Sequence, residues 1–211
     1  MSRKEKLSKF HRESILSVAS ELFEENGVEK TTVDMICKRA EYSKATVYVY
    51  FQSKDEILDA IVLESMKWLK NKIKIAINKS LTSEDCYFGI CNAVAVMQEE
   101  KPIYFERMIE NINVNIESAE TPKIYSEIYQ IGEEINVLLY RFAEVGIRKG
   151  EVQNVDIPSM IFMLWSCITG VVRMAFQKEE YLEKSIEMSR EEYLKYGFEQ
   201  LACLILVRDN L

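Results

Sequence analysis

Glycine and proline are scarce in this chain, which has 7 glycines and 3 prolines among its 211 residues. An average composition would give about 25 such residues in a chain of this length. Because these two residues punctuate most turns, their scarcity predicts few turns and long continuous elements. It favours helices over a many-stranded sandwich or barrel. With 48% hydrophobic residues, the chain also has enough apolar surface to fold around a packed core.

Apolar residues recur at helical spacing along the whole chain, which predicts an all-α fold of about nine helices. Asn26 and Gly27 are typical of a helix end, and Thr31 and Thr32 offer hydroxyls that can cap the next helix. Asp34 stands three residues after Thr31, as in a capping box. The expected helices span residues 9–26, 33–40, 44–50, 54–80, 83–99, 102–116, 122–149, 158–176 and a last segment from 189 onward.

The second and third expected helices are short and are separated by three residues, 41–43. Two short helices with such a turn form a helix-turn-helix, whose second helix can lie in the major groove of DNA. Val47 and Phe51 are expected to pack inward from this second helix. The alternative is a helical hairpin that only packs.

The overall charge of −7 hides an asymmetry along the sequence. Residues 1–12 hold five basic and one acidic side chain, and residues 30–54 hold five and two. Residues 55–211 instead hold 17 basic and 26 acidic side chains. Positive charge therefore gathers in the basic N-terminal segment and around the turn motif, where DNA phosphates would be met.

A longer pattern surrounds the turn and resembles the N-terminal DNA-binding domain of TetR-family transcriptional regulators over about residues 9–58. Its residues are Gly27, Thr31, Thr32, Ser43, Thr46, Tyr48, Tyr50, Phe51 and Lys54. The resemblance implies a helix-turn-helix domain over residues 1–53 and a larger helical effector-binding and dimerisation domain over residues 54–211. Glu41 stands where many members have glycine. A left-handed turn residue other than glycine costs about 1–2 kcal/mol, so the turn could be adjusted.

Two kinds of DNA contact are expected from these positions. Residues at the start of the recognition helix come within reach of base edges: Lys44, Ala45 and Thr46. The others are expected to contact phosphate groups: Thr32, Ser43, Tyr48, Tyr50 and Lys54.

The resemblance also implies a ligand-responsive repressor that leaves its operator when a small molecule binds the larger domain. Aromatic and thioether side chains could line a wide, adaptable cavity there, although most could equally be ordinary core residues. The candidates are Trp68, Met97, Tyr104, Phe105, Met108, Tyr125, Tyr129, Met163 and Trp165. A homodimer reading a palindromic operator would form through the last two helices, where Gly170 and Ala175 allow close approach.

Other function classes find little support in the sequence. The chain has one histidine, His11, which is interpreted as an exposed bystander in the N-terminal segment. It has none of the usual catalytic motifs, so an enzyme is not expected. Five cysteines without a C-x-x-C pair argue against a zinc site, and no cofactor or metal is expected. Free thiols fit the cytoplasm. The most apolar stretch, 13 residues from Met160 to Val172, is shorter than the roughly 20 that a membrane span needs. The alternative function is a DNA-organising or partner-binding module without ligand control.

Overall fold

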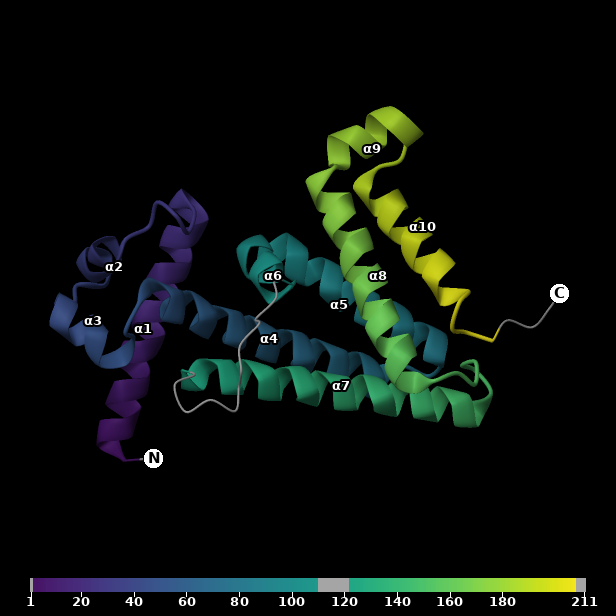
Figure 1. The fold of residues 1–211 in the computed structure, drawn as a ribbon, viewed down its shortest axis with the longest axis horizontal. Coiled ribbons are helices and arrows are strands. Elements are labelled where there is room, and N and C mark those ends of the chain that lie inside the picture. The colour runs from purple at the N-terminus through teal and green to yellow at the C-terminus, as the bar shows by residue number, and fades with distance from the viewer. Residues whose placement is uncertain (1, 110–121, 208–211) are drawn as a thin grey trace. The chain divides into compact units, whose positions relative to one another are not determined.

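The computed structural model describes residues 2–109 and 122–207 of the chain. The elements in these two ranges are helices, apart from one isolated antiparallel bridge between Val152 and Leu206 (Figure 1). The all-α prediction is therefore confirmed. The helices are α1 (Arg3–Asn26), α2 (Val33–Ala40), α3 (Lys44–Tyr50), α4 (Lys54–Lys79), α5 (Ser83–Glu100), α6 (Pro102–Ile109), α7 (Lys123–Lys149), α8 (Ile157–Gln177), α9 (Glu179–Ile186) and α10 (Arg190–Ala202).

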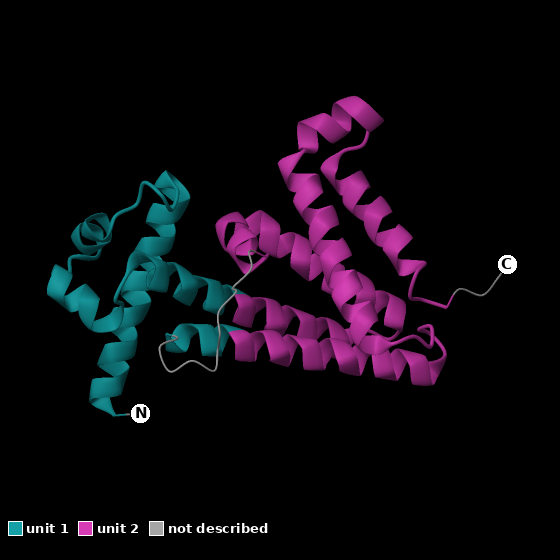
Figure 2. Cartoon of the chain, in the orientation of Figure 1, with its two compact units in different colours: residues 1–65, 110–128 teal, residues 66–109, 129–211 magenta. Residues whose placement is uncertain are grey.

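The chain forms two compact units (Figure 2). The N-terminal unit holds the described residues among 1–65 and 110–128, and the C-terminal unit holds those among 66–109 and 129–211. Helices α4 and α7 each contribute residues to both units. The functional division predicted between residues 53 and 54 stays a prediction.

The N-terminal unit is built on α1, which begins at Arg3 and not near residue 9 as predicted. The extra turns follow from a capping box at the chain start. The backbone N–H of Glu5 donates to Ser2 Oγ at 3.2 Å, and the Ser2 N–H donates to a carboxylate oxygen of Glu5 at 2.7 Å. Further along, apolar side chains of α1 form the core of this unit: Ile15, Leu16, Ala19, Leu22 and Phe23.

The corner between α1 and α2 corrects a second prediction. The N-cap of α2 is Thr32, whose hydroxyl accepts from the Met35 N–H at 3.2 Å. Thr31 is buried, and its hydroxyl lies 3.0 Å from the Leu22 carbonyl and 2.9 Å from the Gly27 carbonyl. These carbonyl groups lie in the last turn of α1 and at the glycine that follows it. The capping box predicted for Thr31 and Asp34 is therefore wrong, because Thr31 serves the preceding helix.

The core of the C-terminal unit lies between α5 and its neighbours α8 and α10. Tyr87 of α5 is buried and donates a hydrogen bond from its hydroxyl to the Phe198 carbonyl of α10 at 3.0 Å. The same helix buries Cys91, Val94 and Met97. Helix α5 is therefore central to this core, and α8 and α10 pack against it.

Two element boundaries in this unit differ from the sequence prediction. Helix α9 was not expected: it lacks a side-chain N-cap, buries only Leu182, and ends at Ile186, where Glu187 follows in the left-handed conformation. The last helix ends at Ala202, before the apolar residues Leu204 and Ile205 that the helical pattern included. The predicted continuation of the sixth helix to residue 116 lies outside the described residues.

Candidate nucleic-acid interface

The turn between α2 and α3 keeps the left-handed conformation without glycine. Glu41 has φ 58° and ψ 33°, and its N–H, like that of Tyr42, donates to the Cys37 carbonyl. This arrangement closes the C-terminus of α2 in the usual way for a left-handed cap. The expectation that the turn is adjusted is therefore wrong. The backbone adopts the strained conformation at Glu41 itself.

The start of α3 is fixed by Ser43. Its hydroxyl accepts from the Thr46 N–H at 3.0 Å and lies 2.8 Å from the Thr46 hydroxyl. Val47 and Phe51 are buried, as predicted. The opposite face is open to solvent and carries Lys44, Ala45, Tyr48 and Val49. The structure therefore gathers the predicted base-reading residues at one exposed helix start.

Two basic side chains of the predicted site already have partners. Lys44 Nζ lies 2.8 Å from a carboxylate oxygen of Asp34 on α2, and this hydrogen bond raises the pKa of Lys44. Lys54 Nζ donates to the Val28 carbonyl in the α1–α2 loop at 2.7 Å. An ammonium group has three N–H donors, so each lysine can keep its partner and still meet DNA. The hydrogen bond from Lys54 to Val28 also fastens the start of α4 to the α1–α2 loop.

Sequence reasoning missed the contribution of α1 to this surface. His11 Nδ1 lies 2.7 Å from the Tyr42 hydroxyl, so His11 is not the bystander that was expected. Its ring also lies 6.2 Å, centre to centre, from that of Tyr50. The Arg12 guanidinium stands 4.8 Å above the centre of the Phe51 ring. Helix α1 thus holds both ends of α3. Sequence spacing could not have revealed these contacts, because they join residues that lie far apart in the sequence.

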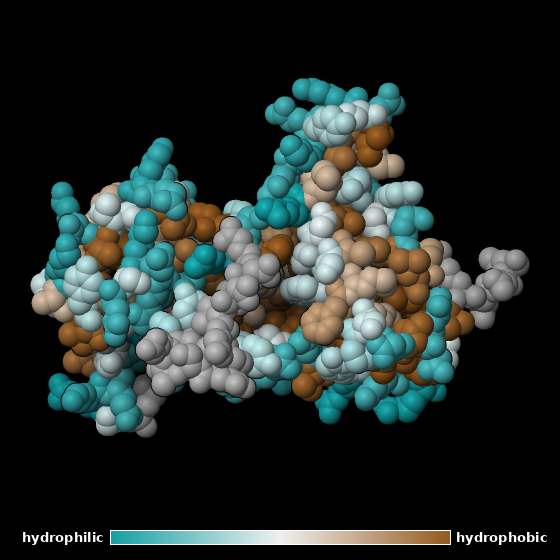
Figure 3. Space-filling model, viewed as in Figure 1, coloured by the Kyte–Doolittle hydropathy of each residue, from teal (hydrophilic) through white to brown (hydrophobic). Residues whose placement is uncertain are grey.

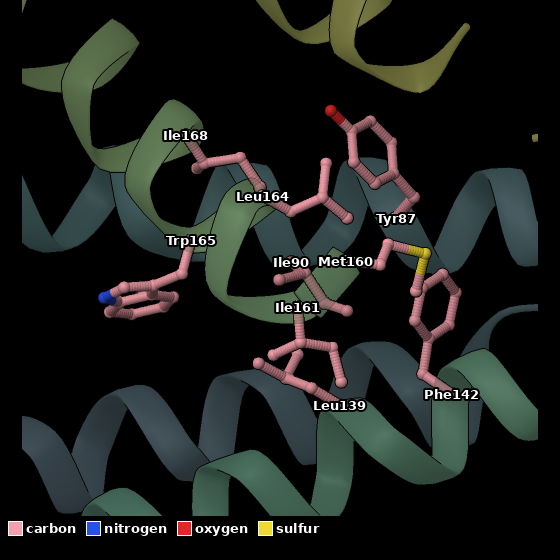
Figure 4. Close-up of a pocket in the computed structure, with 9 residues that line it drawn as sticks. All are labelled: Tyr87, Ile90, Leu139, Phe142, Met160, Ile161, Leu164, Trp165 and Ile168. Atoms are coloured by element: carbon pink, nitrogen blue, oxygen red, sulfur yellow. The ribbon is translucent and has the colours of Figure 1, made fainter. Parts of the chain in front are cut away.

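A small apolar cavity lies in the C-terminal unit, between α5, α7 and α8 (Figure 4). Its volume is about 30 Å³, whereas ligand pockets typically measure roughly 300–1,000 Å³. It is lined by Tyr87, Ile90, Leu139, Phe142, Met160, Ile161, Leu164, Trp165 and Ile168.

Only one residue of the predicted effector set, Trp165, lines this cavity. The other predicted residues lie in three kinds of place. Met97, Tyr104 and Phe105 are core residues, and Trp68 and Met108 pack partly buried against the same core. Tyr129 and Met163 are exposed. Tyr125 is half-buried and belongs to the N-terminal unit. Helical periodicity finds which residues face inward, but it does not show where the interior is hollow.

Helix α8 exposes an apolar face. Phe162 is 59% exposed, and Met163, Gly170 and Met174 are also exposed along the helix. Figure 3 shows hydrophobic residues on the face of the C-terminal unit formed by α8 and α10. By length and composition alone α8 could cross a membrane, and 39% of its most apolar stretch is buried. Helix α8 has 21 residues and is therefore longer than the 13-residue apolar stretch from Met160 to Val172.

Comparison with known proteins finds similar sequences. Residues 15–61 match the family described as bacterial regulatory proteins, tetR family. YhgD of Bacillus subtilis (strain 168), named an uncharacterized HTH-type transcriptional regulator, is 24% identical over 150 residues, covering 71% of this chain and 76% of that protein. IcaR of Staphylococcus aureus (strain Newman) is named the HTH-type negative transcriptional regulator of the biofilm operon icaADBC. It is 27% identical over 146 residues, covering 68% and 76%.

The fold is also similar to that of solved structures. FadR from Bacillus subtilis, solved in complex with stearoyl-CoA, superposes with a TM-score of 0.64 at 18% identity, covering 90% of this chain and 96% of that one. At this identity the likeness shows the fold alone. The similar proteins are transcription regulators and not enzymes, which confirms the prediction that this chain is not an enzyme.

The strain at Glu41 gives a first prediction. Glu41→Gly should raise the free energy of unfolding by up to about 1 kcal/mol, because glycine adopts positive φ without a Cβ clash. Urea unfolding followed by circular dichroism measures the change. Glu41→Ala is the matched control: it also removes the carboxylate but keeps the Cβ, so it should not stabilise. Equal effects of the two substitutions would contradict the assignment of strain to this turn.

Proposed function

Because the chain carries the DNA-binding domain and the fold of the TetR family of transcriptional regulators, we propose that it is a repressor. It binds a palindromic operator as a homodimer in the cytoplasm and leaves the operator when a small molecule binds the C-terminal unit. The observation that carries this proposal is the exposed, Ser43-capped start of α3, which lies within residues 30–54, a segment with five basic and two acidic side chains. IcaR is named a negative transcriptional regulator, which supports repression over activation.

The proposed contacts divide by their place on the helix-turn-helix. Lys44, Ala45 and Thr46 read base edges, because they stand at the start of α3, where Lys44 and Ala45 are exposed and Thr46 is half-buried. The remaining residues contact phosphates, with Thr32 and Ser43 also presenting helix N-termini: Thr32, Ser43, Tyr48, Tyr50 and Lys54. Lys54 would use an N–H that does not serve Val28.

The homodimer proposal rests on the apolar face of α8. An exposed stripe containing Phe162, Met163 and Met174 is unfavourable in water, and a second copy of the same face would bury it. Gly170, at the middle of that stripe, has open space around its Cα. Tyr196 of the neighbouring α10 is also exposed and would extend the contact.

The effector proposed here has an apolar body, because the cavity between α5, α7 and α8 is lined by apolar side chains and aromatic rings. The stearoyl-CoA bound by FadR from Bacillus subtilis has such a body. At about 30 Å³ the cavity must expand to admit it. This small volume also favours a second candidate function, a helix-turn-helix module that organises DNA or partners without ligand control.

Selection of bound sequences from randomised duplex DNA, at about 0.15 M salt, tests the proposal directly. An enriched inverted repeat is expected, and its half-site spacing would give the separation of the two recognition helices. Failure of a folded, dimeric protein to enrich any sequence would contradict the proposed repressor.

Two substitutions separate base reading from phosphate contact. Thr46→Ala should relax preference at one position of each half-site by about 1–3 kcal/mol, because a base-edge contact is lost. Tyr48→Phe should weaken binding to all sequences alike, because a phosphate contact carries no sequence information. Titration against the selected operator and its single-base variants measures both. A sequence-dependent loss for Tyr48→Phe would contradict its proposed role.

The proposed dimer interface is tested by an apolar-to-acidic substitution. Met163→Glu should give a monomer with weakened operator binding, because burying an unpaired carboxylate at the interface is costly. Analytical ultracentrifugation measures the association state. Leu81→Glu makes the same chemical change at a residue that is 86% exposed in the α4–α5 loop, and should leave the dimer intact. A dimeric Met163→Glu protein would refute this interface.

The two tryptophans allow the cavity to be tested by fluorescence. Trp165 lines the cavity and Trp68 does not. Titration with decanol, as an apolar probe, should change the emission of the Trp68→Phe variant and leave that of Trp165→Phe unchanged. The same probe should release the wild-type protein from its operator. Equal responses from both variants would point to unspecific binding and contradict the cavity as the effector site.

A further inference from the structure

We propose that the first turns of α1, Arg3–Phe10, form a second DNA-contacting surface, which binds phosphate groups that flank the bases read by α3. This segment is called the basic extension below. The inference rests on the proposed DNA-binding function and adds to it a surface outside the helix-turn-helix. It follows from the order, the charge and the position of the extension.

The basic extension is an ordered helix without tertiary packing. Residues 2–10 are all exposed, whereas the contacts of α1 with the helix-turn-helix begin at His11 and Arg12. At 1.5 Å per residue, its eight positions reach roughly 12 Å past those contacts. The Ser2–Glu5 capping box defines where the helix starts. A helix end with no packed face gains little stability from tertiary structure, so a role outside the fold is the better explanation.

The charge of the extension is positive where a helix disfavours it. Four basic residues stand in its eight positions: Arg3, Lys4, Lys6 and Lys9. Cations near a helix N-terminus oppose the helix dipole. Residues 13–29, the remainder of the helix and the loop after it, hold no basic and five acidic residues. The basic residues are therefore gathered at the end of α1 that least favours them.

Most of this charge is available to a partner. Within the part of the chain that the structure describes, no carboxylate lies within ion-pair distance of Arg3, Lys4 or Lys6. Lys9 has only an exposed partner, Glu13, at 3.5 Å. Because successive helical residues turn by about 100°, the four basic residues are distributed around the helix axis. Some of them can meet a polyanion whichever side it approaches.

The position of the extension selects DNA as that polyanion. His11 and Arg12 pack against Tyr42, Tyr50 and Phe51, which flank or end the recognition helix α3. Figure 1 shows the N-terminal end of α1 extending past α3. DNA held by α3 carries a phosphate about every 1.7 Å along its axis, so neighbouring phosphates lie within reach of side chains anchored beside that helix.

An anionic membrane is the competing partner, and the sequence of the extension disfavours it. Leu7 and Phe10 are 56% and 62% exposed, but they are the only large apolar residues of the extension. Arg3 and Lys6 lie on the same side of the helix as these two apolar residues. A helix that lies on a membrane needs a broad apolar face separated from its charges.

The test neutralises the extension in the full-length protein. The variant R3Q/K4Q/K6Q/K9Q keeps Ser2 and Glu5, so the capping box is retained. Its control, K74Q/K79Q/R148Q/K178Q, removes the same charge from exposed residues of the C-terminal unit. Affinity is measured from 50 to 300 mM salt for the operator selected by the wild-type protein, on a duplex that ends at the inverted repeat and on one with about six extra base pairs on each side.

The wild-type and control proteins should bind the longer duplex more tightly than the shorter one. The extension variant should lose this gain and bind the longer duplex about tenfold or more weakly. Its plot of log affinity against log salt should become shallower by about 2 for each protomer, since each phosphate contact contributes about 0.9. Its preference among base sequences should not change.

Three results would overturn the inference. An unchanged salt dependence and unchanged flank gain in a variant with wild-type helix content would show that the extension does not touch DNA. An equal loss in the control would assign the effect to net charge. Loss of binding to vesicles containing phosphatidylserine, with DNA affinity retained, would assign the extension to a membrane. A wild-type protein that selects no sequence would instead refute the proposed function, and this inference with it.

Discussion

Burial of two side chains, Val47 and Phe51, is the interaction on which the proposed DNA-reading surface depends. Helix α3 has seven residues, and a helix of this length is not stable alone in water. Its shape is imposed by packing of these residues into the N-terminal unit and by the Ser43 cap at its start. His11 and Arg12 then hold its two ends. The exposed face of α3 can be polar and variable because the buried face alone maintains the helix.

Much of this architecture could be predicted because it is encoded locally. The Asn26–Gly27 stop and the Ser43 cap depend on neighbours within four residues, and the inward positions Val47 and Phe51 follow from helical spacing. The start of α1, the role of Thr31 and the Lys54–Val28 contact could not be predicted, because each depends on groups brought together by folding. The cavity shows the same limit. Its lining residues were recognisable as apolar, but a void is a property of several helices at once.

The size of the cavity constrains how an effector could act. A ligand shifts an equilibrium only through different affinities for two conformations. In the proposed function, the cavity of about 30 Å³ has to expand before such a ligand binds. Effector affinity would then include the free energy of reaching an expanded state. Helix α4 is the element through which that state could be sensed, because it is one unbroken helix with residues in both compact units, and Lys70 on it pairs with Glu134 of α7 at 2.6 Å.

The buried hydroxyl of Thr31 has a consequence for the mechanics of the N-terminal unit. The hydroxyl lies within hydrogen-bonding distance of the carbonyls of Leu22 and Gly27 and so constrains the loop between α1 and α2. Lys54 ties the start of α4 to the same loop through Val28. Deforming this corner would leave buried polar groups without partners, which is costly. In the proposed function, a signal arriving through α4 would therefore leave the shape of the DNA-reading surface unchanged.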